Sequence, residues 1–119
     1  MASTDFAARI PDPMIEEIEP AELTRRRQSG ELWQLLDVRE AWELETATVG
    51  DIIHIPMAVV PDRLGELDPE LPTAVLCHSG ARSRRVAQYL RACGFRRVAN
   101  VSGGIDLWSQ TVDPSIARY

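Results

Sequence analysis

The 119-residue sequence contains no lysine, and all 13 of its basic residues are arginine. This absence excludes Schiff-base chemistry and a Walker-type phosphate loop, because both depend on a lysine amine. No apolar run approaches the roughly 20 residues that a membrane-spanning helix needs. Only two cysteines and two histidines are present, which is too few for a disulfide framework, and their spacing fits no zinc site.

The length and composition favour one compact domain. Hydrophobic residues make up 45% of the chain and charged residues 26%, as in ordinary soluble globular proteins. The net charge of −5 argues against nucleic acid or an anionic membrane as the main partner. The first residues lack the apolar segment of a signal peptide, so we expect a cytoplasmic protein.

The charge is distributed unevenly along the chain. Residues 71–105 contain six arginines and no acid, giving +6, and the remaining seven arginines and 18 acids give −11, which sums to −5. This pattern predicts a local positive field that attracts a small anion near residue 80. Four of the six are expected to form a solvated helix face instead: Arg84, Arg91, Arg96 and Arg97.

Short apolar runs alternate with helical patterns along the chain. Strands are expected at residues 15–18, 33–38, 52–55, 74–77 and 98–101, and helices at 20–30, 40–45, 60–67, 82–93 and 105–108. This alternation is typical of an α/β protein with a mostly parallel sheet, in which ligands bind beyond the carboxyl ends of the strands. Cys77 stands at the end of one predicted strand.

The segment 77–83, with the sequence CHSGARS, joins that strand to the strongest predicted helix. Gly80 permits a tight turn, and the N–H groups of such a turn, the helix dipole and Arg82 together stabilise a cysteine thiolate, the reactive form. The alternative is that Cys77 is a small buried core residue. His78 is either a general base or a loop residue whose backbone N–H matters more than its ring.

The segment 77–83 resembles the active-site loop Cys-x-x-Gly-x-Arg-Ser of the rhodanese-like sulfurtransferases. Residues 36–40 (LDVRE), 54–56 (HIP) and 103–108 (GGIDLW) resemble three further family segments in the expected order, whereas residues 47–52 depart from the family pattern. The resemblance implies a three-layer α/β fold with a central, mostly parallel sheet of five strands flanked by helices. It covers about residues 13–110, leaving a flexible lead at 1–12 and a tail at 111–119.

The resemblance also implies a chemistry. Cys77 would attack the sulfane sulfur of thiosulfate or a persulfide donor, become a persulfide, and pass the sulfur to a thiol or protein acceptor. Arg82 would hold the anionic part of the donor or pin the loop, and Asp37 and Arg39 would support the loop as an ion pair or turn contact. No cofactor is needed, because the persulfide carries the transferred atom. The groups expected to cradle it are the backbone N–H groups of His78, Ser79, Gly80, Ala81, Arg82 and Ser83.

Two other functions remain open. Phosphatases and arsenate reductases of this fold have five residues between the cysteine and the arginine, whereas four separate Cys77 from Arg82, which favours sulfur transfer. A non-catalytic rhodanese-like binding module is the second alternative, although such modules often lack the cysteine. Cys93 is predicted to lie in the core. It is about 16 Å from the start of its predicted helix, which is too far for a disulfide with Cys77.

Overall fold

The computed structural model describes residues 15–119, and the predicted lead at residues 1–12 lies outside them. Five strands form one sheet in the order β1-β5-β4-β2-β3, and every neighbouring pair is parallel. The strands are β1 (Glu16–Ile18), β2 (Gln34–Asp37), β3 (Ile53–His54), β4 (Thr73–Leu76) and β5 (Val98–Val101). The predicted α/β fold with a central five-stranded parallel sheet is therefore confirmed.

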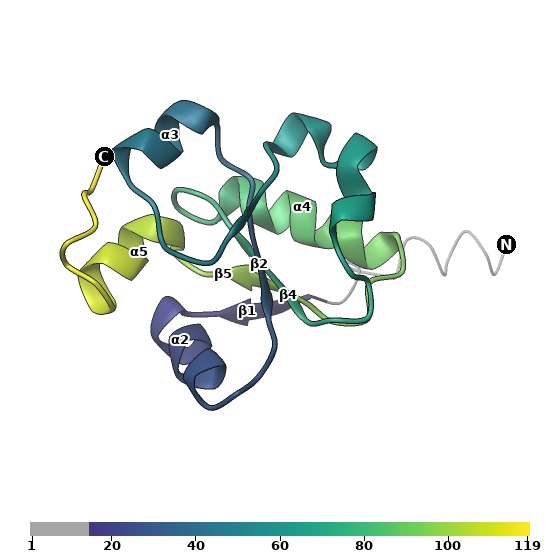
Figure 1. Cartoon of the computed structure of the whole chain (residues 1–119), viewed down its shortest axis with the longest axis horizontal. Coiled ribbons are helices and arrows are strands. Elements are labelled where there is room, and N and C mark those ends of the chain that lie inside the picture. Colours follow the sequence, from purple (N-terminus) through teal and green to yellow (C-terminus); the bar gives the residue numbers. More distant parts are fainter. Residues whose placement is uncertain (1–14) are drawn as a thin grey trace, which may run out of the picture.

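Helices cover both faces of the sheet (Figure 1). The α-helices are α2 (Pro20–Gln28), α3 (Ala41–Thr46), α4 (Ala81–Ala92) and α5 (Gly104–Thr111), and two 3-10 helices are η1 (Met57–Val59) and η2 (Pro61–Glu66). Helices α2 and α5 pack together on one face, whereas α4 and the two 3-10 helices cover the other. Among residues 15–119, none of the helices has the length and apolar character to cross a membrane.

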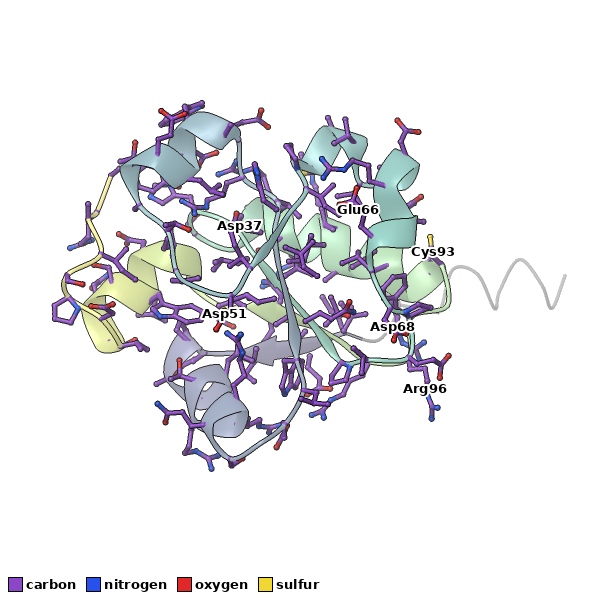
Figure 2. The ribbon with its side chains drawn as sticks, in the orientation of Figure 1. Asp37, Asp51, Glu66, Asp68, Cys93 and Arg96 are labelled. Atoms are coloured by element: carbon purple, nitrogen blue, oxygen red, sulfur yellow. The ribbon has the colours of Figure 1, made fainter. Side chains whose placement is uncertain are left out.

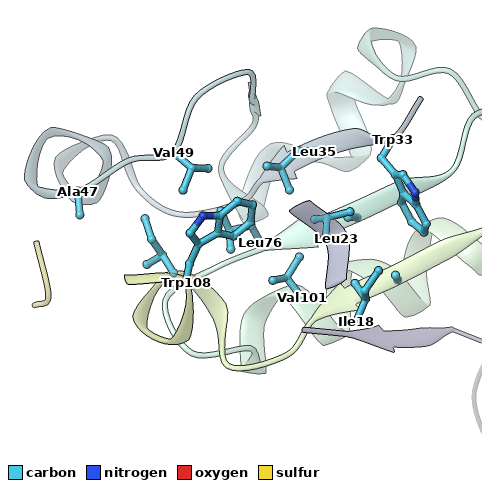
Figure 3. Close-up of a cluster of buried hydrophobic side chains, with 12 residues drawn as sticks. Ile18, Leu23, Trp33, Leu35, Ala47, Val49, Leu76, Val101 and Trp108 are labelled. Carbon is cyan, nitrogen blue, oxygen red and sulfur yellow. The ribbon is translucent and has the colours of Figure 1, made fainter. Parts of the chain in front are cut away.

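Alternating side chains along the strands supply two hydrophobic clusters. In β4, Ala74 and Leu76 face α2 and α5, whereas Val75 and the following Cys77 face α4. Figure 3 shows the first cluster, in which Trp108 of α5 packs near Leu76. Because both faces are covered, all four residues of the central strand β4 are buried, as expected for a strand inside a parallel sheet. The carboxyl ends of the central strands β2 and β4 lead into the loops described below.

The helix predicted for residues 60–67 is only partly correct. The segment forms the 3-10 helix η2, which follows η1, and Arg63 within it has non-helical angles (φ −122°, ψ 21°). Pro61 lacks an N–H, and Gly65 has little helix propensity, so the segment cannot sustain a regular α-helix. The apolar spacing of Val60, Leu64 and Leu67 nevertheless serves its expected purpose, because all three pack against the α4 side of the sheet.

The prediction that Cys93 lies in the core is wrong, because this residue is exposed. Helix α4 ends at Ala92, and the chain turns at Gly94, which has a φ of +98°. Cys93 therefore leaves the apolar stripe, and Phe95, which is buried, takes the corresponding place in the core. Figure 2 shows Cys93 at the outer end of α4. Both cysteines are free.

Candidate active site

The Cys77 sulfur lies inside a ring of backbone that connects β4 to α4. The residue is 1% exposed and belongs to the α4-side cluster, yet its Sγ accepts hydrogen bonds from the backbone N–H groups of Gly80 (3.1 Å) and Ser83 (3.3 Å). Gly80, at a φ of +111°, makes the turn and caps α4. Two N–H donors and a helix N-terminus surround the sulfur, and this arrangement favours a negative charge on it.

A side-chain network from β5 holds the far side of this ring. Ser83 Oγ lies 3.2 Å from Cys77 Sγ and donates a hydrogen bond to Asn100 Oδ1. The amide of Asn100 in turn donates to the carbonyl of Gly80 at 3.2 Å. All three residues are buried. Asn100 was not predicted as a site residue, although it is the one polar residue of β5, because its partners Ser83 and Gly80 are 17 and 20 positions away in the sequence.

Helix α5 orients the first two peptide groups of the loop. The N–H groups of Ile105 and Asp106 donate to the carbonyls of Cys77 (2.9 Å) and His78 (3.1 Å). In a trans peptide the N–H points opposite to the carbonyl, so the N–H groups that follow these two carbonyls point away from α5. Among residues 15–119, the N–H groups of Ser79, Ala81 and Arg82 have no hydrogen-bond acceptor.

Gly104 makes this close approach of α5 possible. It has a φ of +59°, and a Cβ added there would lie 2.4 Å from the His78 carbonyl oxygen and 2.5 Å from that of Cys77. We expect Gly104→Ala to lower the free energy of unfolding by about 1–3 kcal/mol and to slow alkylation of Cys77, because the backbone has to shift. Urea unfolding and the rate of carboxymethylation measure the two effects.

Gly65→Ala is the matched control, since a Cβ at Gly65 meets nothing within 4 Å. That variant should match the parent protein in both measurements. An equal effect of the two substitutions would contradict the packing role of Gly104.

Arg82 is held by Glu43, a residue that the sequence analysis did not single out. Its Nη1 and Nη2 atoms donate to the two carboxylate oxygens of Glu43 at 2.7 and 2.8 Å. Glu43 belongs to α3 and also forms a capping box with Glu40, which was the one local signal for it. The hydrogen bonds from Arg82 lower the pKa of Glu43 to about 2.

The same ion pair raises the pKa of Arg82 despite partial burial, and the nearby Cys77 and Tyr119 raise it further. Because a bidentate carboxylate already occupies this guanidinium, the geometry favours the second of the two predicted roles of Arg82, which is to pin the loop.

Asp37 and Arg39 form a buried ion pair after β2. Both side chains are fully buried, with Nη2 of Arg39 2.7 Å from Oδ2 of Asp37, and the Arg39 backbone N–H also donates to this carboxylate at 3.0 Å. Burial lowers the pKa of the Arg39 guanidinium, but the hydrogen bonds with Asp37 and Tyr119 outweigh this, so the pKa is raised. His54 Nε2 donates to the Arg39 carbonyl at 2.7 Å. These residues order the backbone beside the cysteine loop.

Tyr119, in the tail, joins these two ion pairs. Its hydroxyl accepts a hydrogen bond from Arg39 Nη1 at 3.0 Å and donates one to Glu43 Oε2 at 2.7 Å. Its ring stacks on the His78 ring, with centroids 4.1 Å apart and planes 14° from parallel. Burial raises the pKa of Tyr119 to about 12. Sequence reasoning assigned no chemistry to this tail, because its packing partners are far away along the chain.

Of the six arginines in residues 71–105, four are paired with acids from distant segments: Arg82 with Glu43, as described above, and three others. These three ion pairs are Arg84–Glu17, Arg96–Glu70 and Arg97–Glu16, at 3.0, 3.2 and 2.6 Å. All of these side chains are more than a third exposed. The predicted solvated helix face is only partly correct, because Arg84 and Arg91 lie on α4 whereas Arg96 and Arg97 follow it, and Arg91 is half-buried. The positive field expected from residues 71–105 is weakened by the ion pairs, and the donors nearest the sulfur are backbone N–H groups.

Comparison with known proteins identifies the family of this chain. A family model described as Rhodanese-like domain matches residues 19–111. The chain belongs to the rhodanese-like family. Among solved structures, the fold of this rhodanese-like chain is similar to that of a rhodanese-like domain protein from Staphylococcus aureus, with a TM-score of 0.76 and 28% identity. The match covers 88% of this chain and 99% of that one.

Several relatives of this rhodanese-like chain are sulfurtransferases. It is 33% identical over 104 residues to a sulfurtransferase of Allochromatium vinosum, covering 87% of this chain and 97% of that protein. It is 32% identical over 94 residues to the thiosulfate sulfurtransferase GlpE of Pseudomonas savastanoi pv. phaseolicola, covering 79% and 87%. The rhodanese-like/PpiC domain-containing protein 12 of Arabidopsis thaliana is 43% identical over 90 residues, but the chain spans only 30% of its length.

Proposed function

We propose that this protein is a sulfurtransferase that moves a sulfane sulfur from thiosulfate or a persulfide donor to a thiophilic acceptor through a persulfide on Cys77. The observation that carries the proposal is the pair of backbone N–H groups, from Gly80 and Ser83, that donate to the Cys77 sulfur. The kinship with sulfurtransferases of similar length supports the reaction class.

The first half-reaction loads the enzyme. The Cys77 thiolate attacks the outer sulfur of thiosulfate, a new S–S bond forms, and the bond to the sulfonate sulfur breaks so that sulfite leaves with the electron pair. In the second half-reaction a thiolate or cyanide acceptor attacks the outer sulfur of the Cys77 persulfide. The acceptor keeps that sulfur, and Cys77 regains its thiolate. No oxidant or reductant is consumed, and ping-pong kinetics follow.

The loop provides hydrogen-bond donors for both the Cys77 thiolate and the Cys77 persulfide. The N–H groups of Gly80 and Ser83 already point at Sγ, and those of Ser79, Ala81 and Arg82 are without acceptors in the described chain, so they are available to the outer sulfur of the persulfide. The Ser83 hydroxyl, which now donates to Asn100, is close enough to turn its proton toward a charged sulfur.

Arg82 and the Asp37–Arg39 pair act in this proposal by holding the loop. Glu43 anchors Arg82 from α3, and the buried pair orders the segment after β2, so the N–H groups stay aimed at the sulfur during both steps. Such preorganised dipoles stabilise developing charge without reorganising. The four residues between Cys77 and Arg82 form a ring suited to a single sulfur atom rather than to a tetrahedral phosphate or arsenate.

Intact-protein mass spectrometry before and after incubation with thiosulfate tests the proposal. We expect one added sulfur atom, removable by a reductant or by cyanide and mapped to the peptide containing Cys77. The Cys93→Ser variant should gain the same sulfur, because Cys93 lies at the far end of α4. Absence of the added sulfur with thiosulfate and with organic persulfides, or turnover of aryl phosphates or arsenate, would overturn the assignment.

A further inference from the structure

The predicted tail begins one residue inside α5, and its remainder, residues 112–119, folds back along α5 to the cysteine loop. Figure 1 shows the C-terminal end of the chain beside α3. The Ser109 hydroxyl donates to the Ile116 carbonyl at 2.6 Å, and Arg118 pairs with Asp106 of α5 at 2.8 Å. Val112, Ile116 and Tyr119 pack against the cluster on the α5 side of the sheet. The tail is therefore held at several points before it reaches the loop.

Access to the Cys77 sulfur is closed on most sides. The sheet and the α4-side cluster lie beneath it, the α5 backbone lies against the Cys77 and His78 carbonyls at Gly104, and the Ser83–Asn100 hydrogen bond stands on the β5 side. A cavity of about 500 Å³ lies beside the loop on that side, but its lining includes neither Cys77 nor Ser83. On the remaining side, His78 stacks on Tyr119 and Arg82 pairs with Glu43 of α3.

Tyr119 lies on this side of the loop. Its ring covers the ring of His78, its hydroxyl bonds to the carboxylate that binds Arg82, and its edge meets Trp42 at a centroid distance of 6.1 Å. Trp42 is 61% exposed, so this pair of aromatic rings lies at the protein surface. Two hydrogen bonds and a stacking contact hold the Tyr119 side chain in one orientation.

We propose that Tyr119 is a specificity-determining residue whose ring narrows the mouth above Cys77, so that small inorganic donors such as thiosulfate reach the sulfur more readily than bulky organic persulfides. This inference rests on the proposed sulfur transfer for its choice of substrates, whereas the steric filter itself concerns any reagent that reacts with the Cys77 thiol. Tyr119 takes no chemical part in the transfer and only limits which reagents reach the Cys77 sulfur.

The experiment compares three substitutions in a Cys93→Ser background, where Cys77 is the single remaining thiol. Tyr119→Ala removes the ring, Tyr119→Leu keeps apolar packing with a smaller side chain, and Tyr119→Phe keeps the ring but loses the hydroxyl. For each variant, alkylation rates are measured with iodoacetamide and with a bulky N-aryl maleimide. The values of kcat/KM for thiosulfate and for glutathione persulfide are measured in parallel.

We expect Tyr119→Ala to raise two ratios by about tenfold: the alkylation rate with the maleimide over that with iodoacetamide, and kcat/KM for glutathione persulfide over that for thiosulfate. Tyr119→Leu should give intermediate values of both ratios. Tyr119→Phe should leave both ratios within about twofold of the parent, since pocket shape is preserved. The ratio separates a steric role of Tyr119 from an effect on the reactivity of Cys77. A change in the thiolate population or in the loop position would change the rates with both reagents together.

Unchanged ratios in the folded Ala and Leu variants would overturn the inference and leave access through the β5-side cavity as the alternative. A shift in the Phe variant equal to that in Ala would also overturn it, because the hydroxyl network and not the ring would then control entry. If the parent protein forms no persulfide, the proposed function fails, yet the alkylation ratios still report whether Tyr119 filters by size.

Discussion

Replacing Cys77 with serine is expected to reduce sulfur transfer from thiosulfate to cyanide by about 10³-fold or more. Serine is nearly isosteric and retains an acceptor for the N–H groups of Gly80 and Ser83, so the loop should keep its shape. A hydroxyl, however, is not ionised near neutral pH and forms no persulfide, because its oxygen lacks the ready nucleophilicity of a thiolate. Thiocyanate formation measures the loss.

Two controls separate this chemical loss from a structural one. The Cys93→Ser variant changes the other cysteine, which is exposed, and should keep the parent's rate. Urea unfolding of Cys77→Ser should give a free energy close to that of the parent, because the substituted atom stays within the same ring of N–H donors. Sulfur transfer at the parent's rate by Cys77→Ser would show that Cys77 is not the nucleophile.

Replacing Asp37 with alanine is expected to lower the free energy of unfolding by about 3–5 kcal/mol. Arg39 is fully buried, and Asp37 supplies its only carboxylate within the described chain, accepting from Nε, Nη2 and the backbone N–H. The variant therefore leaves a buried guanidinium without a counter-ion. A typical domain is stable by only about 5–15 kcal/mol, so a loss of this size is visible in equilibrium urea unfolding.

An exposed ion pair provides the matched control for Asp37. Arg96 and Glu70 lie 3.2 Å apart with side chains 71% and 67% exposed, and Glu70→Ala should cost at most about 1 kcal/mol. The double variant Asp37→Leu with Arg39→Met removes both buried charges and should recover much of the stability lost in Asp37→Ala. A loss in Asp37→Ala no larger than that in Glu70→Ala would contradict the structural role of this pair.

The local sequence predicts most elements of this fold for identifiable reasons. Pro20 suits the first turn of a helix, and Val86, Ala87 and Leu90 form the apolar stripe of α4. Five short apolar runs gave all five strands to within two residues at each end. The misplacement of Cys93 has a simple cause: periodicity continues in a sequence beyond the residue where the helix itself turns away.

The sequence by itself determined the cysteine loop and the parallel sheet, because a strand, a tight turn at Gly80 and a helix N-terminus are set by neighbouring residues. Only the tertiary structure decided which distant groups complete the site. Glu43 meets Arg82 across 39 positions and Tyr119 meets Glu43 across 76, and no local propensity encodes such contacts. They form because parallel strands bring their carboxyl ends to one edge, where loops from separate parts of the chain are packed together.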